Sequence, residues 1–401
     1  MRSVQGATVF ENLPQPRKWQ IRALDLWNRS SRRGIVEVVT GGGKTLLAMY
    51  AIRQWLNEAP SSAKVLILVP TTALQDQWLV TLTVDAGIPR GCISVWPSEK
   101  AIDRQFQIMV VNTARSNARL LERASEAIFV VADECHRYGS LENSRAIGIR
   151  SHASLGLTAT AEREYDDALY KILIPNLGPV IYEYSLLDAL RDGVITPFRL
   201  MNVQTDLNAD EKLEYSRLTK SLSIALSQGD EEKAQSIAMR RSMVSKRAVS
   251  RIPTAVALTL RSPRTKTLIF HEDIESADLI VKVLRKHGVR ALAYHSKIGS
   301  DMRRDNLRMF KEGQIDSLVA CRALDEGLDV PGAQRAILVA STSSTRQRIQ
   351  RIGRVLRRSS EKDMAEVITI YATDGERDQL AEESQGLDEV AEVKWLEVVR
   401  K

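Results

Sequence analysis

Short apolar runs alternate with helical patterns along the first half of the chain. Four runs are rich in β-branched residues and four to six residues long: 34–39, 65–69, 108–111 and 128–132. Such runs suit strands that are buried on both faces of a parallel sheet. The longer segments between them, such as 46–57, have the periodicity of a helix. The pattern therefore predicts an α/β, doubly wound layout.

The alternation stops near Pro197 and resumes further along the chain. Residues 208–260 have a helical pattern with few strand-like runs. The rhythm then restarts with strand-like runs at 266–270, 291–294, 317–320, 336–339 and 367–370. We predict two α/β domains, residues 1–195 and 196–401, with a helical insertion at about 208–260.

A glycine-rich loop, Thr40–Thr45 (T-G-G-G-K-T), lies between a predicted strand and a predicted helix. Glycines let backbone N–H groups crowd around phosphate oxygens, and the helix N-terminus adds partial positive charge. Lys44 should reach the β- and γ-phosphates of ATP, and the Thr45 hydroxyl should ligate Mg²⁺. The strict motif has a further glycine where this chain has Val38, so a plain glycine turn is the alternative.

Two acids follow the apolar run 128–132, in the sequence Asp133-Glu134-Cys135-His136. An acid at the end of a buried strand can hold a Mg²⁺-bound water, which is the role expected of Asp133. Glu134 is then the candidate base that deprotonates the attacking water. The alternative is that the acids only cap a helix. The upstream phosphate loop favours the catalytic interpretation.

A basic run, Gln347–Arg358 (Q-R-I-Q-R-I-G-R-V-L-R-R), lies far downstream of the loop. Such a run alone is typical of a solvated helix face. Together with a phosphate loop it suggests arginines that stabilise the charge developing on a γ-phosphate during hydrolysis. The sequence thus indicates an NTPase that uses ATP and Mg²⁺.

The composition is that of an ordinary folded protein, with 401 residues, 44% hydrophobic and 27% charged. The net charge of +7 leans modestly toward a polyanionic partner. Cysteines stand singly at positions 92, 135 and 321, which argues against a disulfide framework or a zinc site. No signal peptide or apolar run of membrane-spanning length is visible, so we expect an intracellular, cytoplasmic protein without membrane contact.

The loop, D-E-C-H and Q-x-x-G-R-x-x-R, in that order, resemble the superfamily 2 helicases and translocases. The resemblance extends over nearly the whole chain and implies two tandem RecA-like domains, with the helical insertion between the third and fourth motifs. It implies that ATP is hydrolysed at the cleft between the domains. Further elements fit the family pattern: Arg17-x-x-Gln20, Val69–Leu74, Asn112-Thr113, Thr158-Ala159-Thr160, Phe270-His271, Tyr294-His295-Ser296 and Cys321–Pro331.

The resemblance implies a role for each matching residue. Those expected to carry out hydrolysis are Lys44, Asp133, Glu134, His136, Gln350, Arg354 and Arg357. Those expected to bind nucleotide are Arg17, Gln20, Thr40, Gly41, Gly42, Gly43, Lys44, Thr45, Gly327 and Asp329, with Thr45 and Asp133 holding Mg²⁺. Those expected to contact nucleic acid are Pro70, Thr71, Thr72, Asn112, Thr113, His295, Ser296 and Arg322. Thr158, Ala159 and Thr160 are expected to couple hydrolysis to movement. His271 and His295 are also well explained as structural histidines near strand ends.

The motif details look most like the DNA-acting branch, which includes the XPB-like, UvsW-like and restriction-motor enzymes. The resemblance therefore implies an ATP-dependent DNA helicase or translocase that contacts the phosphate backbone. Two alternatives stay open: an RNA helicase, or the motor subunit of a repair, restriction or defence complex. Residues 208–260 either guide a strand or dock a protein partner. The segment carries a basic cluster of Arg240, Arg241, Lys246, Arg247 and Arg251, of which the first four line a nucleic-acid channel or form a solvated face.

Overall fold

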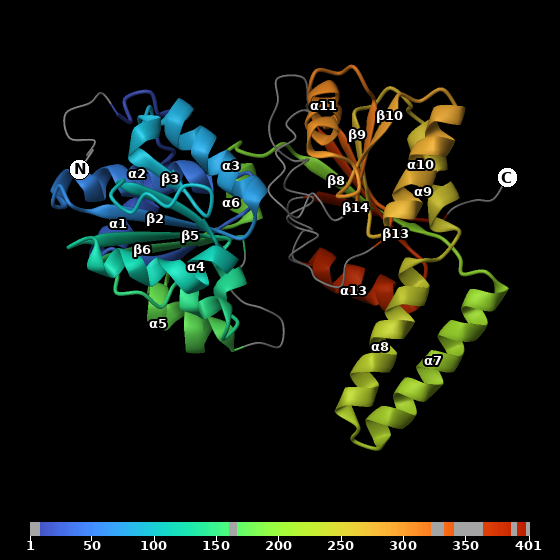
Figure 1. Ribbon diagram of the computed structural model, residues 1–401. Helices are drawn as coiled ribbons and strands as arrows, with labels where there is room; N and C mark the ends of the chain where they lie inside the picture. The colour runs from blue at the N-terminus through green and yellow to red at the C-terminus, as the bar shows by residue number, and fades with distance from the viewer. Residues whose placement is uncertain (1–8, 160–166, 322–332, 341–363, 386–390, 398–401) are drawn as a thin grey trace. The chain divides into compact units, whose positions relative to one another are not determined.

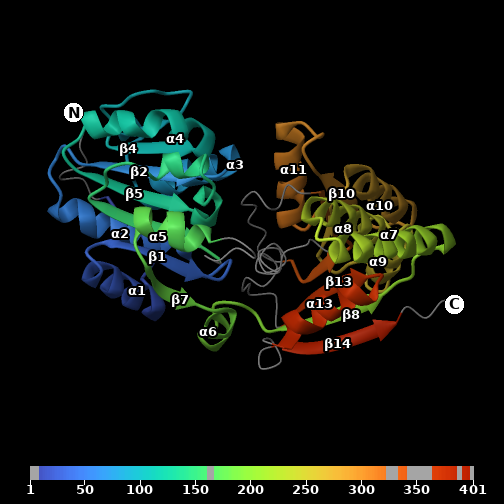
Figure 2. The same ribbon diagram turned by 90° about the horizontal axis from the view of Figure 1, so that it is seen from below.

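The computed structural model describes residues 9–159, 167–321, 333–340, 364–385 and 391–397. The chain divides into two compact units, Met1–Ala189 and Leu190–Lys401, each described below by itself (Figures 1 and 2).

Unit 1 is built on a seven-stranded sheet with the order β3-β4-β2-β5-β6-β1-β7, and every strand pair is parallel. The strands are β1 (Arg33–Val38), β2 (Lys64–Val69), β3 (Ile93–Val95), β4 (Phe106–Val110), β5 (Ile128–Asp133), β6 (Ala153–Thr158) and β7 (Val180–Tyr184). The central strands β2, β5 and β6 are buried at every position. The apolar runs 65–69 and 128–132 predict β2 and β5, whereas β6 lies outside the predicted strand-like runs.

Helices cover both faces of this sheet, with α2 and α3 on one side and α4 and α5 on the other (Figure 1). The helices are α1 (Lys18–Arg29), α2 (Lys44–Glu58), α3 (Thr72–Val80), α4 (Val111–Asn117) and α5 (Ile174–Leu177), and α6 (Leu186–Arg191) lies at the unit boundary. Short 3-10 or π turns are η1 (Thr81–Asp85), η2 (Arg90–Cys92), η3 (Ala118–Arg123), η4 (Cys135–Tyr138), η5 (Asn143–Ala146) and η6 (Leu169–Leu173).

Unit 2 repeats the plan with a second seven-stranded parallel sheet, of order β10-β11-β9-β12-β13-β8-β14. The strands are β8 (Phe198–Gln204), β9 (Thr267–His271), β10 (Ala291–Tyr294), β11 (Ser317–Cys321), β12 (Arg335–Leu338), β13 (Ala365–Tyr371) and β14 (Ala391–Glu397). The helices are α7 (Ala209–Ser227), α8 (Glu231–Lys246), α9 (Arg251–Leu260), α10 (Ile274–Lys286), α11 (Ser300–Lys311) and α13 (Asp374–Gln385). The fold prediction of two parallel-sheet domains is confirmed.

The helical segment of unit 2 begins with a hairpin of α7 and α8 that extends away from its sheet (Figure 1). Asn208 and Glu211 form a capping box at the start of α7, which fixes where the helix begins. A small apolar cluster joins the two helices, including Leu218, Ala225 and Ile237.

The basic cluster expected on this segment does not form one surface, and the inclusion of Arg251 in it is wrong. Arg251 is fully buried because its guanidinium is satisfied by carbonyl groups and by Glu376. Lys246 is mostly covered and pairs with Glu272 at 3.6 Å.

Candidate ATP-binding and hydrolysis site

The loop after β1 has a backbone that requires glycine. Gly41 and Gly43 have φ values of 87° and 107°, in the left-handed region that side chains disfavour. A Cβ on Gly42 would lie 2.6 Å from Val38 Cγ1, so this position also excludes a side chain. The loop ends at Lys44, the first residue of α2, where the helix presents free N–H groups. Its geometry fits a phosphate-binding loop.

Two side chains from the start of α1 hold this loop. Arg17 Nη1 donates to the Gly42 carbonyl at 2.8 Å, and Gln20 Nε2 donates to the Gly43 carbonyl at 3.0 Å. Gln20 Oε1 in turn accepts the Arg17 backbone N–H at 2.8 Å. These two residues, which are expected to bind nucleotide, therefore lie directly against the phosphate loop.

The acids predicted for hydrolysis lie at the end of β5, beside Lys44. Lys44 Nζ and Glu134 Oε1 are 2.9 Å apart, so both side chains reach the same point above the loop. Glu134 has a φ of 49°, a strained value for a residue with a side chain, which sets the direction of its carboxylate. Such strain is typical of functional positions.

Asp133 is 6% exposed, and both of its carboxylate oxygens accept hydrogen bonds. Oδ1 accepts the Glu134 backbone N–H at 3.0 Å, and Oδ2 accepts the indole N–H of Trp78 at 2.8 Å. Burial and the charge of Glu134 raise the pKa of Asp133, while Lys44 and the two N–H donors oppose this. The carboxylate is thus oriented from two directions.

His136 connects these acids to the predicted coupling motif. Its ring Nδ1 lies 3.0 Å from the Thr158 hydroxyl, and both side chains are buried. The same nitrogen lies 3.5 Å from Glu134 Oε2. A shift of Thr158 would therefore move the His136 imidazole, which lies next to the Glu134 carboxylate. Ala159 follows β6, and Thr160 lies outside the described residues.

The site fits an ATP phosphate group with its Mg²⁺. Thr40 Oγ1, in the loop, is a buried oxygen that no hydrogen-bond partner satisfies among the described residues. Thr45 and Asp133 supply the hard oxygen donors that Mg²⁺ prefers. When bound, Mg²⁺ would neutralise charge on the β- and γ-phosphates. Lys44 would bind the same phosphates, and Glu134 would accept the proton of the attacking water.

Residues predicted to contact a nucleic-acid strand lie at one edge of the sheet. Strands β2 and β4 are parallel neighbours, and Val69 pairs with Val110. The residues that follow them, Pro70 and Thr71 after β2 and Asn112 after β4, therefore emerge at the same edge. Thr71 also caps α3 by accepting the Leu74 N–H at 3.3 Å. Exposed members of this group are Thr72 and Asn112, while Pro70, Thr71 and Thr113 are half-buried.

In unit 2, His295 and Ser296 follow β10. His295 is buried, and its Nε2 lies 2.9 Å from Asp278 Oδ1, whereas Ser296 is exposed. The remaining predicted residues lie outside the described part of the chain: Arg322, Gly327, Asp329, Gln350, Arg354 and Arg357.

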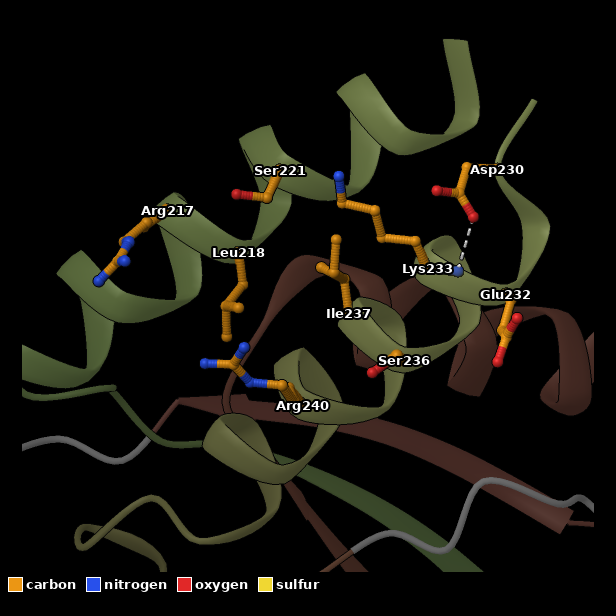
Figure 3. Close-up of a pocket in the computed structure, with 9 residues that line it drawn as sticks. All are labelled: Arg217, Leu218, Ser221, Asp230, Glu232, Lys233, Ser236, Ile237 and Arg240. Carbon is orange, nitrogen blue, oxygen red and sulfur yellow. Dashed lines mark hydrogen bonds between the residues drawn. The ribbon is translucent and has the colours of Figure 1, made fainter. Parts of the chain in front are cut away.

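A groove of about 560 Å³ opens between α7 and α8 (Figure 3). Leu218 and Ile237 form its apolar part, and Arg217, Lys233 and Arg240 bring positive charge to it. The positive charge is partly offset, because Asp230 and Glu232 also line the groove and Glu214 lies 3.9 Å from Arg240. The groove is amphipathic and of mixed charge.

The fold and the site together define the class of protein. Each of the two α/β units is built on a parallel sheet, and the first unit carries a phosphate loop, a Lys–Glu pair and an aspartate at a strand end. Residues 13–163 match the family model described as type III restriction enzyme, res subunit. Residues 250–359 match the helicase conserved C-terminal domain.

Individual relatives agree with these matches. The chain is 27% identical to the DNA 3'-5' translocase XPB2 of Sulfurisphaera tokodaii, over 90% of this chain and 85% of the relative. Other curated relatives are longer, and the chain covers 60% of the DNA 3'-5' helicase XPB of Kineococcus radiotolerans, at 26% identity over 89% of this chain.

Solved structures share the fold at lower identity. A putative HsdR subunit of a type I restriction enzyme from Vibrio vulnificus has a TM-score of 0.65 at 20% identity, covering 96% of this chain and 68% of that one. Dbp5 of S. cerevisiae bound to RNA has a TM-score of 0.65 at 15% identity, covering 96% and 90%.

The two family models and these relatives together support a superfamily 2 helicase or translocase of the XPB-like and restriction-motor type. It is accordingly an ATP-dependent, nucleic-acid-binding hydrolase with tandem RecA-like domains. Among the described residues, none of the helices combines the length and apolar character that a membrane crossing requires.

Sequence reasoning did not identify Trp78 or Trp19 as part of this site. Trp19 stacks on Tyr184 with ring centroids 4.6 Å apart, and the Tyr184 carbonyl accepts the N–H of Val39, just before the loop. A lone tryptophan in a helical pattern gives no sign of such a contact, because burial in a core explains it equally well.

Proposed function

We propose that this protein is a motor that uses ATP hydrolysis to move along or remodel DNA. The observation that carries the proposal is the arrangement of Lys44, Glu134 and Asp133 around a phosphate loop, in a chain whose relatives include a DNA 3'-5' translocase. Mg²⁺ is held by Thr45 and Asp133, and Arg354 and Arg357 stabilise the charge on the γ-phosphate.

DNA is bound through its backbone rather than its bases. Thr71, Thr72, Asn112 and Thr113 emerge at one edge of the first sheet, and they carry hydroxyl and amide groups that suit phosphate oxygens. Thr71 also caps α3, which fixes its position at the start of that helix. Affinity should therefore be independent of sequence and should fall steeply with salt.

The test is steady-state ATPase activity with mixed-sequence single-stranded DNA, duplex DNA and RNA at equal nucleotide concentrations and two salt levels. The Lys44→Ala protein serves as the control for contaminating ATPases. We expect stimulation by DNA of any sequence that weakens at high salt. If RNA alone stimulates the ATPase activity, the proposed substrate is RNA and not DNA.

A second candidate function, a motor subunit switched by a protein partner, is favoured by the α7–α8 hairpin. Large apolar side chains are exposed along it, including Leu213 at 73% and Met239 at 65%. Exposed apolar side chains of this size suit a protein contact better than a phosphate backbone. An ATPase that binds nucleotide well, yet responds to neither DNA nor RNA, would support this candidate over the first.

A further inference from the structure

The indole N–H of Trp78 donates a hydrogen bond to the carboxylate of Asp133. The residue lies in α3 and is 1% exposed, and its Nε1 is 2.8 Å from Asp133 Oδ2. Asp133 ends β5, and its other oxygen is held by the Glu134 N–H at 3.0 Å. The two donors fix the plane of the carboxylate and leave its other lone pairs for a ligand.

Other buried indoles in the same unit show that this choice of partner is not forced by the residue type. Trp27 Nε1 donates to the Ser154 carbonyl at 2.9 Å, and Trp96 Nε1 donates to the Gln107 amide oxygen at 2.7 Å. A neutral acceptor would therefore be enough to satisfy an indole. A bond to a charged carboxylate is stronger and orients the acceptor more firmly.

We propose that Trp78 is a positioning residue for the metal ligand Asp133. Its N–H would hold the carboxylate in the orientation that binds the Mg²⁺ of ATP, directly or through a water bound to the metal. Partners that orient a ligand in this way govern metal affinity in many sites. The proposal rests on the assignment of Asp133 as the Mg²⁺ ligand in the function proposed above.

The helix that carries Trp78 gives the contact a further consequence. α3 begins at Thr72, directly after Thr71, and both residues belong to the group expected to contact a nucleic-acid strand. Trp78 lies six positions after Thr72, a rise of about 9 Å along the helix. A strand bound at the start of α3 therefore acts on the same rigid element that orients Asp133.

The test compares Trp78→Phe, which removes the N–H and keeps an aromatic ring, with Trp27→Phe as the matched control. The affinity for a fluorescent ATP analogue is measured with Mg²⁺ and with EDTA, and the ratio gives the contribution of the metal. We expect Trp78→Phe to reduce this ratio about tenfold, equivalent to about 1.4 kcal/mol. Trp27→Phe should leave it unchanged, although both variants lose a buried hydrogen bond.

A second readout follows the metal itself. Mn²⁺ in place of Mg²⁺, followed by electron paramagnetic resonance in the presence of ADP, should bind more weakly to Trp78→Phe and normally to Trp27→Phe. If Trp78→Phe fails to fold, β-(3-benzothienyl)alanine at position 78 keeps the bicyclic shape and lacks only the N–H donor.

Asp133→Asn separates the two ways in which the idea can fail. If Asp133→Asn leaves the metal contribution unchanged, the assignment of Asp133 is wrong. If Asp133→Asn abolishes that contribution while a folded Trp78 variant keeps the wild-type ratio, the role of Trp78 alone is overturned.

Discussion

Removal of one partner from the buried pair of Arg251 and Glu376 should destabilise unit 2 strongly. Arg251 Nη2 lies 2.7 Å from both carboxylate oxygens of Glu376. Its Nη1 and Nε donate to the carbonyl groups of Val339, Ile370 and Ser245. The guanidinium is 0% exposed, so water cannot replace the carboxylate if it is removed.

Glu376→Ala should therefore lower the free energy of unfolding of unit 2 by about 3–5 kcal/mol, since it leaves a buried charge unpaired. The value should fall near the lower end because the three carbonyl groups still solvate the guanidinium. The variant also leaves the Ala372 N–H, 2.7 Å from Glu376 Oε2, without its acceptor. A loss of this size is a large share of the stability of a typical domain.

The assay can report on unit 2 alone. The chain has six tryptophans, and Trp395 is the one that lies in unit 2. With 5-fluorotryptophan incorporated, urea unfolding is followed by ¹⁹F NMR, and the Trp395 resonance is compared between variants. The control is Glu392→Ala, which removes an exposed pair with Arg199 and should destabilise the unit far less. Equal losses for Glu376→Ala and Glu392→Ala would refute the reasoning.

Other variants test the catalytic assignments and one titration. Lys44→Ala should reduce ATP turnover to background, whereas Glu134→Gln should bind ATP and fail to hydrolyse it; wild-type turnover by Glu134→Gln would exclude it as the base. Arg357→Ala should slow hydrolysis by roughly 10³-fold with affinity largely intact, and the reverse pattern would assign it to binding. Burial lowers the pKa of His271 to about 4, from 6.5, so the unfolded state takes up its proton first. The free energy of unfolding of unit 2 should thus decrease as pH falls from 6.5 toward 4. In the same ¹⁹F assay, His271→Asn should make this free energy less dependent on pH over that range. An unchanged pH dependence in the variant would contradict the role of His271.

The sequence predicts strands that are continuous apolar runs well, and it misses strands of mixed composition such as β6, β8 and β14. Strands such as β2 and β5 are continuous apolar runs, because helices cover both of their faces. β8 (F-R-L-M-N-V-Q) mixes polar and apolar positions, and β14 (A-E-V-K-W-L-E) is mostly exposed at the sheet edge. Neither has the composition of a buried strand. The alternation of strand-like runs and helical patterns in the sequence therefore stops near Pro197, just before β8 begins.

Charge patterns along the chain are similarly ambiguous. In the sequence Arg251 is one member of a basic cluster, yet it is the most deeply buried of that group and donates to the carbonyl groups of Ile370 in β13 and of Val339 just after β12. Its partner Glu376 lies over a hundred positions away. A pairing between such distant residues depends on the tertiary fold, which local patterns do not encode.

The order of strands explains why the coupling motif lies where it does. β6 lies between β1, which leads into the phosphate loop, and β5, which ends in the acids. Thr158 pairs with Glu37 of β1, and Leu157 pairs with Asp133 of β5. A residue at the end of β6 is therefore placed between the predicted phosphate-binding loop and the predicted catalytic acids. The bond between Thr158 and His136 follows from this position, so movement at the end of β6 would change the surroundings of the Glu134 carboxylate without any direct contact with nucleotide.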